Sequence, residues 1–386
     1  MSLRLGAVAG TFLLLLASAD ARATPDPPLP KAPAGFTVSI VAHVPGAREL
    51  AAAPNGDLFV GSLGSEVYLV PDAESKPREA HVFATLPDSS AAGVALGDGY
   101  LYVGTHRAVW RIAYEAGDQT AAQTPQKLAA VRQSAQGGHS TTSVAVSGDR
   151  LYASVGSSCN ACVESDPTRA TIQEMSTTGA GIHPKAIRIR NAIALAVNPA
   201  SGSLWAGVAG QDELEHGHPF EIFDDISVHP GTVDYDWPNC YEDRKVARPG
   251  ADCSNAPLAR VVFPAYETPI GAAFYPEHPA GAHAFPAEYR GGAFVALHGS
   301  WHIPPVAPRV AFVPMHGDDP VSAVDWNDPN AQWKPFLEGF QQPGGWRNGR
   351  PTGVTIGAAG SLFVADDDAG VVYRVRPAES AAQRLP

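Results

Sequence analysis

The chain repeats one pattern of apolar and polar positions about six times. Each copy has a short apolar run, a turn that contains Gly, Asn or Asp, and an aromatic-rich run that ends on a small residue. Within a copy the apolar positions alternate with a period of two, which is typical of strands joined in a hairpin. The copies occupy residues 48–62, 92–105, 142–157, 191–208, 270–276 with 290–300, and 352–367.

The spacing of these copies predicts how the hairpins are arranged. Successive copies begin roughly 45 to 50 residues apart, and a gap near 80 after residue 191 predicts an insertion. This interval is typical of four-stranded propeller blades. We therefore predict an all-β fold, a six-bladed β-propeller with four-stranded antiparallel blades, as a single domain over residues 35–378.

The composition agrees with this fold. The 386 residues include 38 Gly and 35 Pro, which suits many tight turns and long surface loops. The hydrophobic content of 45% excludes a disordered chain. A closed ring of blades can reach this length as one unit.

The two ends of the chain differ from the repeats. Arg4 precedes a short apolar run that begins at Gly10, and Ala21 and Ala23 provide the small residues of a cleavage site. We predict a signal peptide at residues 1–23, a Pro-rich spacer at 24–34 and a C-terminal tail at 379–386. No later segment approaches the ~18 apolar residues of a transmembrane helix. We therefore expect a periplasmic or secreted protein without stable membrane insertion.

Export determines how the four cysteines are interpreted. Cys159 and Cys162 form a C-x-x-C pair, and Cys240 and Cys253 form a second local pair. An oxidising compartment favours a disulfide within each pair. A redox or haem site at the first pair is an alternative, although haem attachment needs His where the chain has Val163. A zinc site built from all four cysteines is a further alternative.

The net charge and the absence of certain motifs argue against several other functional classes of protein. The formal net charge of −12 argues against nucleic-acid binding, which requires clustered Lys and Arg. The sequence also lacks a phosphate-binding glycine loop, the G-x-S-x-G of serine hydrolases and the H-E-x-x-H of zinc proteases.

Polar residues flank several of the predicted inner strands. Because the inner strands of all blades converge on one channel, the residues directly before them face a shared axial site. His139 precedes the third copy, Arg190 the fourth and Arg350 the sixth, while His298 and Trp301 end the fifth. A lone His or Arg in such a place is usually structural, but recurrence at equivalent positions favours a functional site.

These positions lie within motifs of a known family. From about residue 137 to residue 376 the chain resembles the exported glucose/sorbosone dehydrogenases, six-bladed propellers that use pyrroloquinoline quinone (PQQ), and their sorbosone dehydrogenase-like branch in particular. The resemblance rests on residues 151–167 (LYASVGSSCNACVESDP), 205–214, 236–241 (DWPNCY), 287–301 (AEYRGGAFVALHGSW) and 349–354 (GRPTGV).

The resemblance implies a catalytic group. It makes His139 the general base, which removes a proton from the sugar while a hydride leaves the same carbon. Arg190 and Asn191 match an Arg-Asn pair beside the quinone, where a guanidinium stabilises developing negative charge. The implied activity is a PQQ-dependent sugar dehydrogenase that oxidises an aldose or related aldehyde sugar and passes electrons to an external acceptor.

Further residues are implied for the cofactor and for a metal. PQQ carries three carboxylates, which Arg side chains bind well. Arg350 matches a family Arg, Arg309 stands where the family usually has Lys, and Trp301 would stack on or wall in the planar ring system. The family also binds Ca²⁺ through oxygen ligands. The loop with Gln211 and Asp212 is the candidate, and an acidic solvated loop is the alternative.

The chain departs from the family at several positions. Ser157 replaces an Asp that orients the catalytic imidazole in the glucose-oxidising branch, with Glu164 and Asp166 close by in sequence. Thr352 replaces an Arg, and His302 replaces an Asn. These changes leave the substrate open. Two other functions also stay open: a non-catalytic propeller that binds a sugar or protein partner, and a propeller lactonase.

Overall fold

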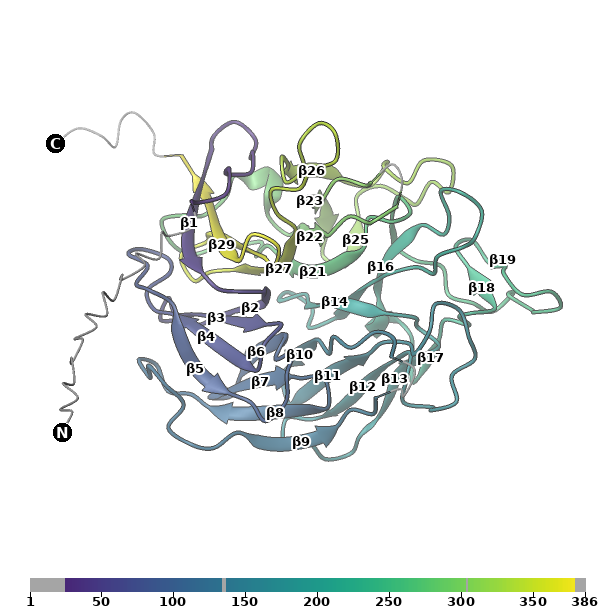
Figure 1. The fold of residues 1–386 in the computed structure, drawn as a ribbon. Coiled ribbons are helices and arrows are strands. Elements are labelled where there is room, and N and C mark those ends of the chain that lie inside the picture. Colours follow the sequence, from purple (N-terminus) through teal and green to yellow (C-terminus); the bar gives the residue numbers. More distant parts are fainter. Residues whose placement is uncertain (1–24, 134–136, 303–304, 379–386) are drawn as a thin grey trace, which may run out of the picture.

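Six small antiparallel sheets surround a central channel like the blades of a propeller (Figure 1). The computed structural model describes residues 25–133, 137–302 and 305–378. Its sheets confirm the predicted fold of six blades with four antiparallel strands each, and the third blade has one additional strand. The predicted signal peptide and C-terminal tail lie outside the described residues.

Within each blade the strands are given in order from the inner strand to the outer one. The strands are β2 (Ala47–Ala52), β3 (Leu58–Ser62), β4 (Glu66–Val70) and β5 (His81–Thr85) in blade one; β6 (Gly93–Gly97), β7 (Tyr100–Gly104), β8 (Ala108–Ala113) and β9 (Gln126–Ala130) in blade two; β10 (Val144–Ser147), β11 (Arg150–Val155), β12 (Thr171–Ser176) and β13 (His183–Ile187) in blade three; β14 (Ala192–Val197), β15 (Leu204–Val208), β16 (Glu221–Asp225) and β20 (Val261–Phe263) in blade four; β21 (Pro269–Phe274), β22 (Ala293–Leu297), β23 (Arg309–Val313) and β26 (Lys334–Leu337) in blade five; and β27 (Pro351–Ile356), β28 (Leu362–Asp366), β29 (Val371–Pro377) and β1 (Phe36–His43) in blade six.

The inner strands form the wall of the channel. Strands β2, β6, β10, β14, β21 and β27 each contact the inner strand of the next blade, and the ring closes between β27 and β2. Each sequence repeat supplies the inner strand and the second strand of one blade, as the period-two pattern predicts.

Blade six is completed by the N-terminal strand. Strand β1 pairs antiparallel with β29, so that Phe36 lies opposite Pro377 and His43 opposite Val371. Blade six is therefore completed by a strand from the other end of the chain, and β1 forms the outer edge of this sheet. Figure 1 shows these two strands side by side.

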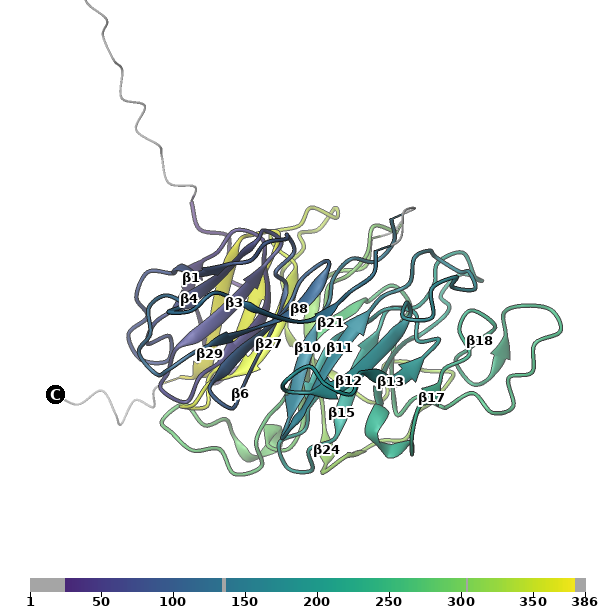
Figure 2. The ribbon, with the colours of Figure 1, turned by 90° about the horizontal axis from the view of Figure 1, so that it is seen from below.

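Two long insertions interrupt the regular order. The predicted one, after β16, contains the short 3₁₀ helix η1 (Ile226–Val228), the strand β17 (Val233–Asp234) and a hairpin of β18 (Cys240–Tyr241) and β19 (Lys245–Val246). Strand β17 joins blade three in parallel, an orientation that the sequence pattern did not predict. Figure 2 shows β18 projecting from the side of the ring.

The interval between the fifth and sixth repeats is equally long, which the repeat spacing did not predict. Blade five holds the 3₁₀ helix η2 (Ala287–Tyr289) before β22, and the hairpin of β24 (Met315–His316) and β25 (Asp319–Pro320) before β26. Among the described residues no helix is long and apolar enough to cross a membrane.

The hydrophobic core is divided among the gaps between neighbouring blades. Six main clusters of buried apolar side chains each join the facing surfaces of two consecutive blades. Trp205 and Phe223 of blade four, for example, pack against Phe274 of blade five. Because every blade is buried against both neighbours, the ring holds the channel at a fixed diameter.

Candidate active site

Inner strands begin, and second strands end, at the same end of the channel, which we call the channel mouth. Hairpin pairing shifts register near the starts of β2, β14, β21 and β27. Such bulges re-aim side chains and are common beside active sites. The residues before the inner strands and after the second strands therefore gather at the channel mouth.

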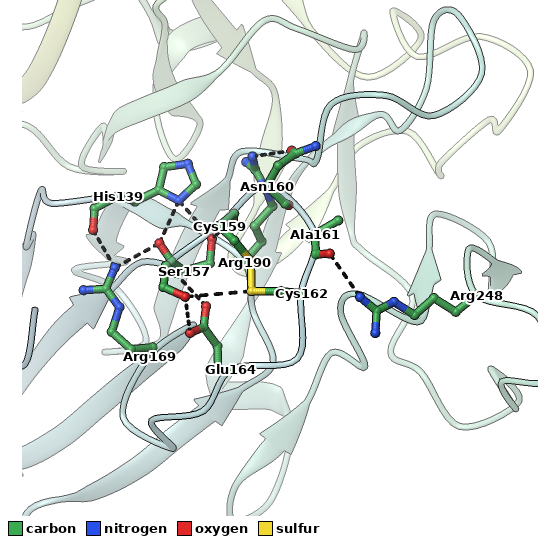
Figure 3. Close-up of a disulfide and its surroundings, with 11 residues drawn as sticks. His139, Ser157, Cys159, Asn160, Ala161, Cys162, Glu164, Arg169, Arg190 and Arg248 are labelled. Carbon is green, nitrogen blue, oxygen red and sulfur yellow. Dashed lines mark hydrogen bonds between the residues drawn. A yellow bond between two sulfur atoms is a disulfide. The ribbon is translucent and has the colours of Figure 1, made fainter. Parts of the chain in front are cut away.

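His139 lies in the loop before β10 and is oriented by Ser157, which follows β11. Its Nδ1 lies 2.9 Å from Ser157 Oγ and 3.2 Å from the Ser157 carbonyl oxygen. The Ser157 hydroxyl donates its hydrogen to the Cys159 carbonyl at 2.8 Å, so both partners of Nδ1 act as acceptors. Nδ1 therefore carries the hydrogen and Nε2 presents a lone pair. Figure 3 shows the second ring nitrogen pointing away from Ser157.

The surroundings keep this imidazole neutral. Burial lowers the pKa of His139 from 6.5 to about 4, and the guanidinium groups of Arg190 and Arg169 also lower it. A group with this pKa is unprotonated throughout the neutral range. His139 thus has the protonation state that a general base requires.

Arg169 holds the loop that carries His139. Its Nη2 donates to the carbonyl oxygens of His139 at 2.8 Å and Ser157 at 2.9 Å. The two acids near in sequence have other partners, because Glu164 accepts from the backbone and hydroxyl of Ser158 and Asp166 accepts from Thr168. Ser157 therefore takes the orienting position, and neither acid does.

Arg190 and Asn191 directly precede β14, and both are buried. Gly156 separates Asn191 from His139, because a Cβ placed on it would lie 2.5 Å from Asn191 Oδ1 and 2.6 Å from His139 Cβ. A larger residue at position 156 would force these two side chains apart. The structure thus brings His139, Arg190 and Asn191 together.

Asn160 connects Arg190 to the candidate metal loop, and the sequence motifs did not single it out. Arg190 Nε donates to the Asn160 carbonyl oxygen at 2.9 Å, and its Nη2 donates to Asn160 Oδ1 at 3.0 Å. The same Oδ1 accepts from the backbone N–H of Asp212 at 2.8 Å. The Asp212 carboxylate lies 3.8 Å from Arg190 and 3.4 Å from His302, and Gln211 beside it is buried.

A further set of hydrogen-bonded polar side chains extends across the channel mouth from blade one through blade six to blade five. Arg48 Nη1 donates to Asp367 at 2.8 Å, and the other oxygen of Asp367 lies 3.0 Å from His298 Nε2. Arg350 donates to the carbonyl oxygens of His298 at 3.2 Å and Gly299 at 3.3 Å. Burial lowers the pKa of His298 to about 4. The sequence pattern did not single out Arg48 and Asp367, because each looks like an ordinary polar residue at the end of a strand.

Arg309 pairs with a carboxylate of its own blade. It begins the third strand of blade five, where its Nη2 lies 3.3 Å from Glu267 Oε1 and its guanidinium lies over the ring of Trp333. Burial raises the pKa of Glu267 to about 7. These contacts brace blade five, and they do not join Arg309 to His139 or Arg190.

Trp301 lies on the rim and is 76% exposed. Its ring stacks on His302 with centroids 4.4 Å apart, and His302 stacks on Tyr266 at 3.7 Å. These three rings line a hollow of about 410 Å³ together with Asn160 and Asp212. The exposed aromatic surface and the Asn160–Arg190 contacts are therefore parts of one region.

The disulfide predictions are confirmed. Cys159 bonds Cys162 and Cys240 bonds Cys253, with Cα atoms 6.0 Å and 5.7 Å apart. The first disulfide lies beside the His139 and Arg190 contacts (Figure 3). Because all four sulfur atoms are bonded in pairs, the zinc and haem alternatives lose their thiols.

Comparison with known proteins relates part of the sequence to one family. Residues 236–378 match the family model described as TrAA12-like. An uncharacterized protein of Borreliella burgdorferi is 23% identical over 193 residues, which cover 49% of this chain and 48% of that protein. The match therefore spans about half the length of this curated relative.

Solved structures match nearly the whole chain. The holo form of the PQQ domain of pyranose dehydrogenase from Coprinopsis cinerea aligns with a TM-score of 0.76 at 18% identity, covering 91% of this chain and 98% of that one. The calcium structure of the Trichoderma reesei carbohydrate-active enzyme of family AA12 gives 0.74 at 19% identity, with coverages of 91% and 98%. PQQ-bound aldose sugar dehydrogenase from Streptomyces coelicolor gives 0.60 at 19% identity, with 90% and 99%. These likenesses establish the shared fold.

Proposed function

We propose that the protein is a quinoprotein sugar dehydrogenase that oxidises an aldose or related aldehyde sugar with PQQ as cofactor. The observation that carries the proposal is the state of His139, whose Nδ1 is held by two acceptors so that a neutral Nε2 faces away from them. This base lies near Arg190, on a propeller shared with a PQQ-bound sugar dehydrogenase. The TrAA12-like match supports the same activity.

The charges at the channel mouth fit an anionic cofactor. Arg48 and Arg347 each have a buried Nε–H with no hydrogen-bond partner among the described residues. The pKa of Arg350 is lowered by burial and by the positive charge of Arg347, so positive charge is crowded here. Carboxylates of PQQ would relieve this repulsion and accept these donors. Arg190, Asn191, Arg350 and Trp301 would hold the cofactor, with Arg309 bracing blade five.

Calcium would be held beside the same residues. The contacts of the Asp212 carboxylate with Arg190 and His302 are too long for strong hydrogen bonds, so its oxygens keep free acceptor capacity. The buried Gln211 adds an amide oxygen. Both are hard oxygen ligands of the kind that Ca²⁺ prefers.

The protein's own residues would act on the sugar as follows. Bound PQQ supplies the acceptor for the two electrons of the reaction. Nε2 of His139 would take the proton from the sugar hydroxyl, while Nδ1 keeps its hydrogen and donates it to the Ser157 oxygens throughout. The Arg190 guanidinium uses three N–H groups on Asn160 and Ala209, so two of its five remain for negative charge in the site.

The electrons would leave to an external acceptor. The C-x-x-C pair is a disulfide and Val163 follows it, so this chain offers no covalent haem attachment there. The N-terminal sequence pattern and the two disulfides support a periplasmic or secreted location. The sorbosone-like assignment within the sugar substrates rests on sequence resemblance alone.

Reconstitution tests this function. The purified protein with added PQQ and Ca²⁺ should reduce a dye when given members of a panel of aldoses and sorbosone. His139→Ala should lower kcat by at least about 100-fold, because general-base catalysis typically contributes that much. The exposed His278 provides the matched control His278→Ala, which should keep wild-type rates.

Other outcomes would support one of the two alternative functions. A protein that binds PQQ by calorimetry but oxidises no sugar would be non-catalytic, and lactone hydrolysis without PQQ would favour a lactonase. The proposal fails if the reconstituted protein neither binds PQQ nor reduces dye and His139→Ala behaves like the wild type.

A further inference from the structure

Asn160 holds two separate parts of the candidate site at once. Its backbone carbonyl and its Oδ1 both accept from Arg190, at 2.9 Å and 3.0 Å. Its Oδ1 also accepts from the Asp212 N–H at 2.8 Å, and its Nδ2 donates to the Asp212 carbonyl oxygen at 3.1 Å. One amide therefore sets both the plane of the Arg190 guanidinium and the backbone of the 211–212 loop.

The disulfide fixes Asn160 in turn. Asn160 lies within the short ring that the Cys159–Cys162 bond closes, which leaves its backbone few alternative conformations. The carbonyl of Cys159 accepts the hydroxyl hydrogen of Ser157, the same group that orients His139. On the other side, Arg248 from the insertion donates to the Ala161 carbonyl oxygen at 3.0 Å. Figure 3 shows this loop between His139 and Arg248.

We propose that Asn160 is a positioning residue that couples Arg190 to the Gln211–Asp212 loop, and that the Cys159–Cys162 disulfide acts through it. Asn160 need not touch the cofactor for this role. This coupling rests on the function proposed above, in which Arg190 holds PQQ and the 211–212 loop holds Ca²⁺. Binding of either ligand then strengthens binding of the other through the Asn160 amide. Reduction of the disulfide loosens both contacts.

The coupling has a simple physical origin. An ordered Arg190 needs an ordered Asn160, and an ordered Asn160 fixes the Asp212 backbone by two hydrogen bonds. A ligand that immobilises either Arg190 or the 211–212 loop also orders part of the other, so the second ligand loses less conformational entropy when it binds. Hydrogen bonds to a charged group are among the stronger ones in proteins, so loss of the Asn160 side chain should weaken ligand binding by about 10- to 100-fold.

The first experiment needs no cofactor. Hydrogen exchange at the Asp212 amide is measured in the wild type and in Asn160→Ala, where we expect exchange at least about 10-fold faster because its acceptor is gone. Asn160→Asp keeps an acceptor for the Asp212 N–H and for Arg190 but loses the Nδ2 donor to the Asp212 carbonyl oxygen. It should therefore retain more of the protection than Asn160→Ala and less than the wild type. The Ala53 amide of blade one, which donates to the Asp57 carbonyl oxygen at 2.8 Å, is the internal reference and should not change. Asn330→Ala, on an exposed loop, is the matched control.

A double-mutant cycle tests whether the disulfide acts through Asn160. Cys159→Ala with Cys162→Ala should speed exchange at Asp212, and adding Asn160→Ala should speed it little further, because residues that act as one unit are not additive. Full additivity would show that the disulfide works by another route and would overturn that part of the proposal.

Calorimetry then measures the ligand coupling. In the wild type, Ca²⁺ should tighten PQQ binding, and in Asn160→Ala the PQQ affinity should fall about 10- to 100-fold while the effect of Ca²⁺ on it shrinks toward none. If the wild type binds neither ligand, the proposed function is wrong. The hydrogen-exchange data still test the positioning role of Asn160, because they need no ligand. The positioning role is overturned if Asp212 exchange in Asn160→Ala equals that in the wild type.

Discussion

At the scale of single residues, the state of His139 depends on what stands at position 157. A serine there accepts the Nδ1 hydrogen without adding charge, so burial and the neighbouring guanidinium groups lower the pKa of the imidazole to about 4. A carboxylate would fix the same tautomer but would also stabilise the protonated ring. The substitution therefore changes the pH range of the base more than its orientation.

The variant Ser157→Asp should move this pH range. A negative charge beside Nδ1 favours the imidazolium, so the pKa of His139 should rise from about 4 by roughly 1 to 2 units. The base form is then lost at a higher pH as the pH falls, and the acid limb of the kcat/KM profile moves up accordingly. Arg169, which donates to the Ser157 carbonyl oxygen, lies close enough to offset the buried carboxylate.

Ser157→Ala is the control for this shift. It removes the Oγ acceptor and keeps the backbone carbonyl at 3.2 Å from Nδ1, so the acid limb should stay near the wild-type position. An unmoved limb in Ser157→Asp, in a variant that still folds and binds PQQ, would show that another group controls the profile.

At the scale of strands and loops, sequence reasoning worked where the pattern is local. The inner two strands of every blade were predicted because a period-two hairpin around a Gly or Asn turn carries its own signal. The role of β1 was not predicted, since its partner β29 lies at the far end of the chain. The positions of β16 and β20 were not predicted because the insertion between them separates the outer strands of blade four and this stretch has no repeat pattern.

The candidate site divides in the same way. His139, Arg190, Asn191 and Arg350 stand at equivalent places before inner strands, so the repeat pointed to them. Asn160 bonds the Arg190 guanidinium and the Asp212 backbone, and any polar loop residue can form bonds of these kinds. The one feature of the sequence that could have indicated Asn160 is its position between Cys159 and Cys162, in a short disulfide ring that follows Ser157.

The closing strand β1 should contribute measurably to stability. Phe36 lies edge-on to Phe285 at 4.7 Å, Phe336 at 5.3 Å and Tyr289 at 5.4 Å. Phe36→Ala should lower the free energy of unfolding by about 2 to 4 kcal/mol, near the lower limit for a buried Phe because the ring is half-buried. Urea denaturation measures the loss.

The exposed Val82 of β5 gives a control in an outer strand. Val82→Ala removes apolar surface that is 40% exposed and should change stability by less than about 0.5 kcal/mol. Equal effects of the two variants would mean that β1 does not help to hold the ring closed.

At the scale of the whole molecule, the ring is closed by backbone packed directly on backbone. A Cβ on Gly353 of β27 would lie 2.6 Å from Glu49 Cα and 2.8 Å from Leu50 N of β2, and one on Gly271 would lie 3.0 Å from Gly353 Cα. Neither glycine has a positive φ, so close approach is what requires Gly. The blades must meet this closely for Arg48 of blade one and Arg350 of blade six to share the channel mouth.

The variant Gly353→Ala should therefore affect stability and the site together. The added methyl group pushes β2 away from β27, which we expect to lower the free energy of unfolding by about 1 to 3 kcal/mol and to separate Arg48 from Arg350. PQQ affinity measured by calorimetry should fall with it. Gly117→Ala is the control for a loss of stability away from the channel, because a Cβ there meets no atom within 4 Å and the φ of +100° adds backbone strain of about 1 to 3 kcal/mol. It should lower stability and leave PQQ affinity unchanged. If Gly353→Ala loses stability but binds PQQ as the wild type does, the distance between blades one and six does not set the geometry of the site.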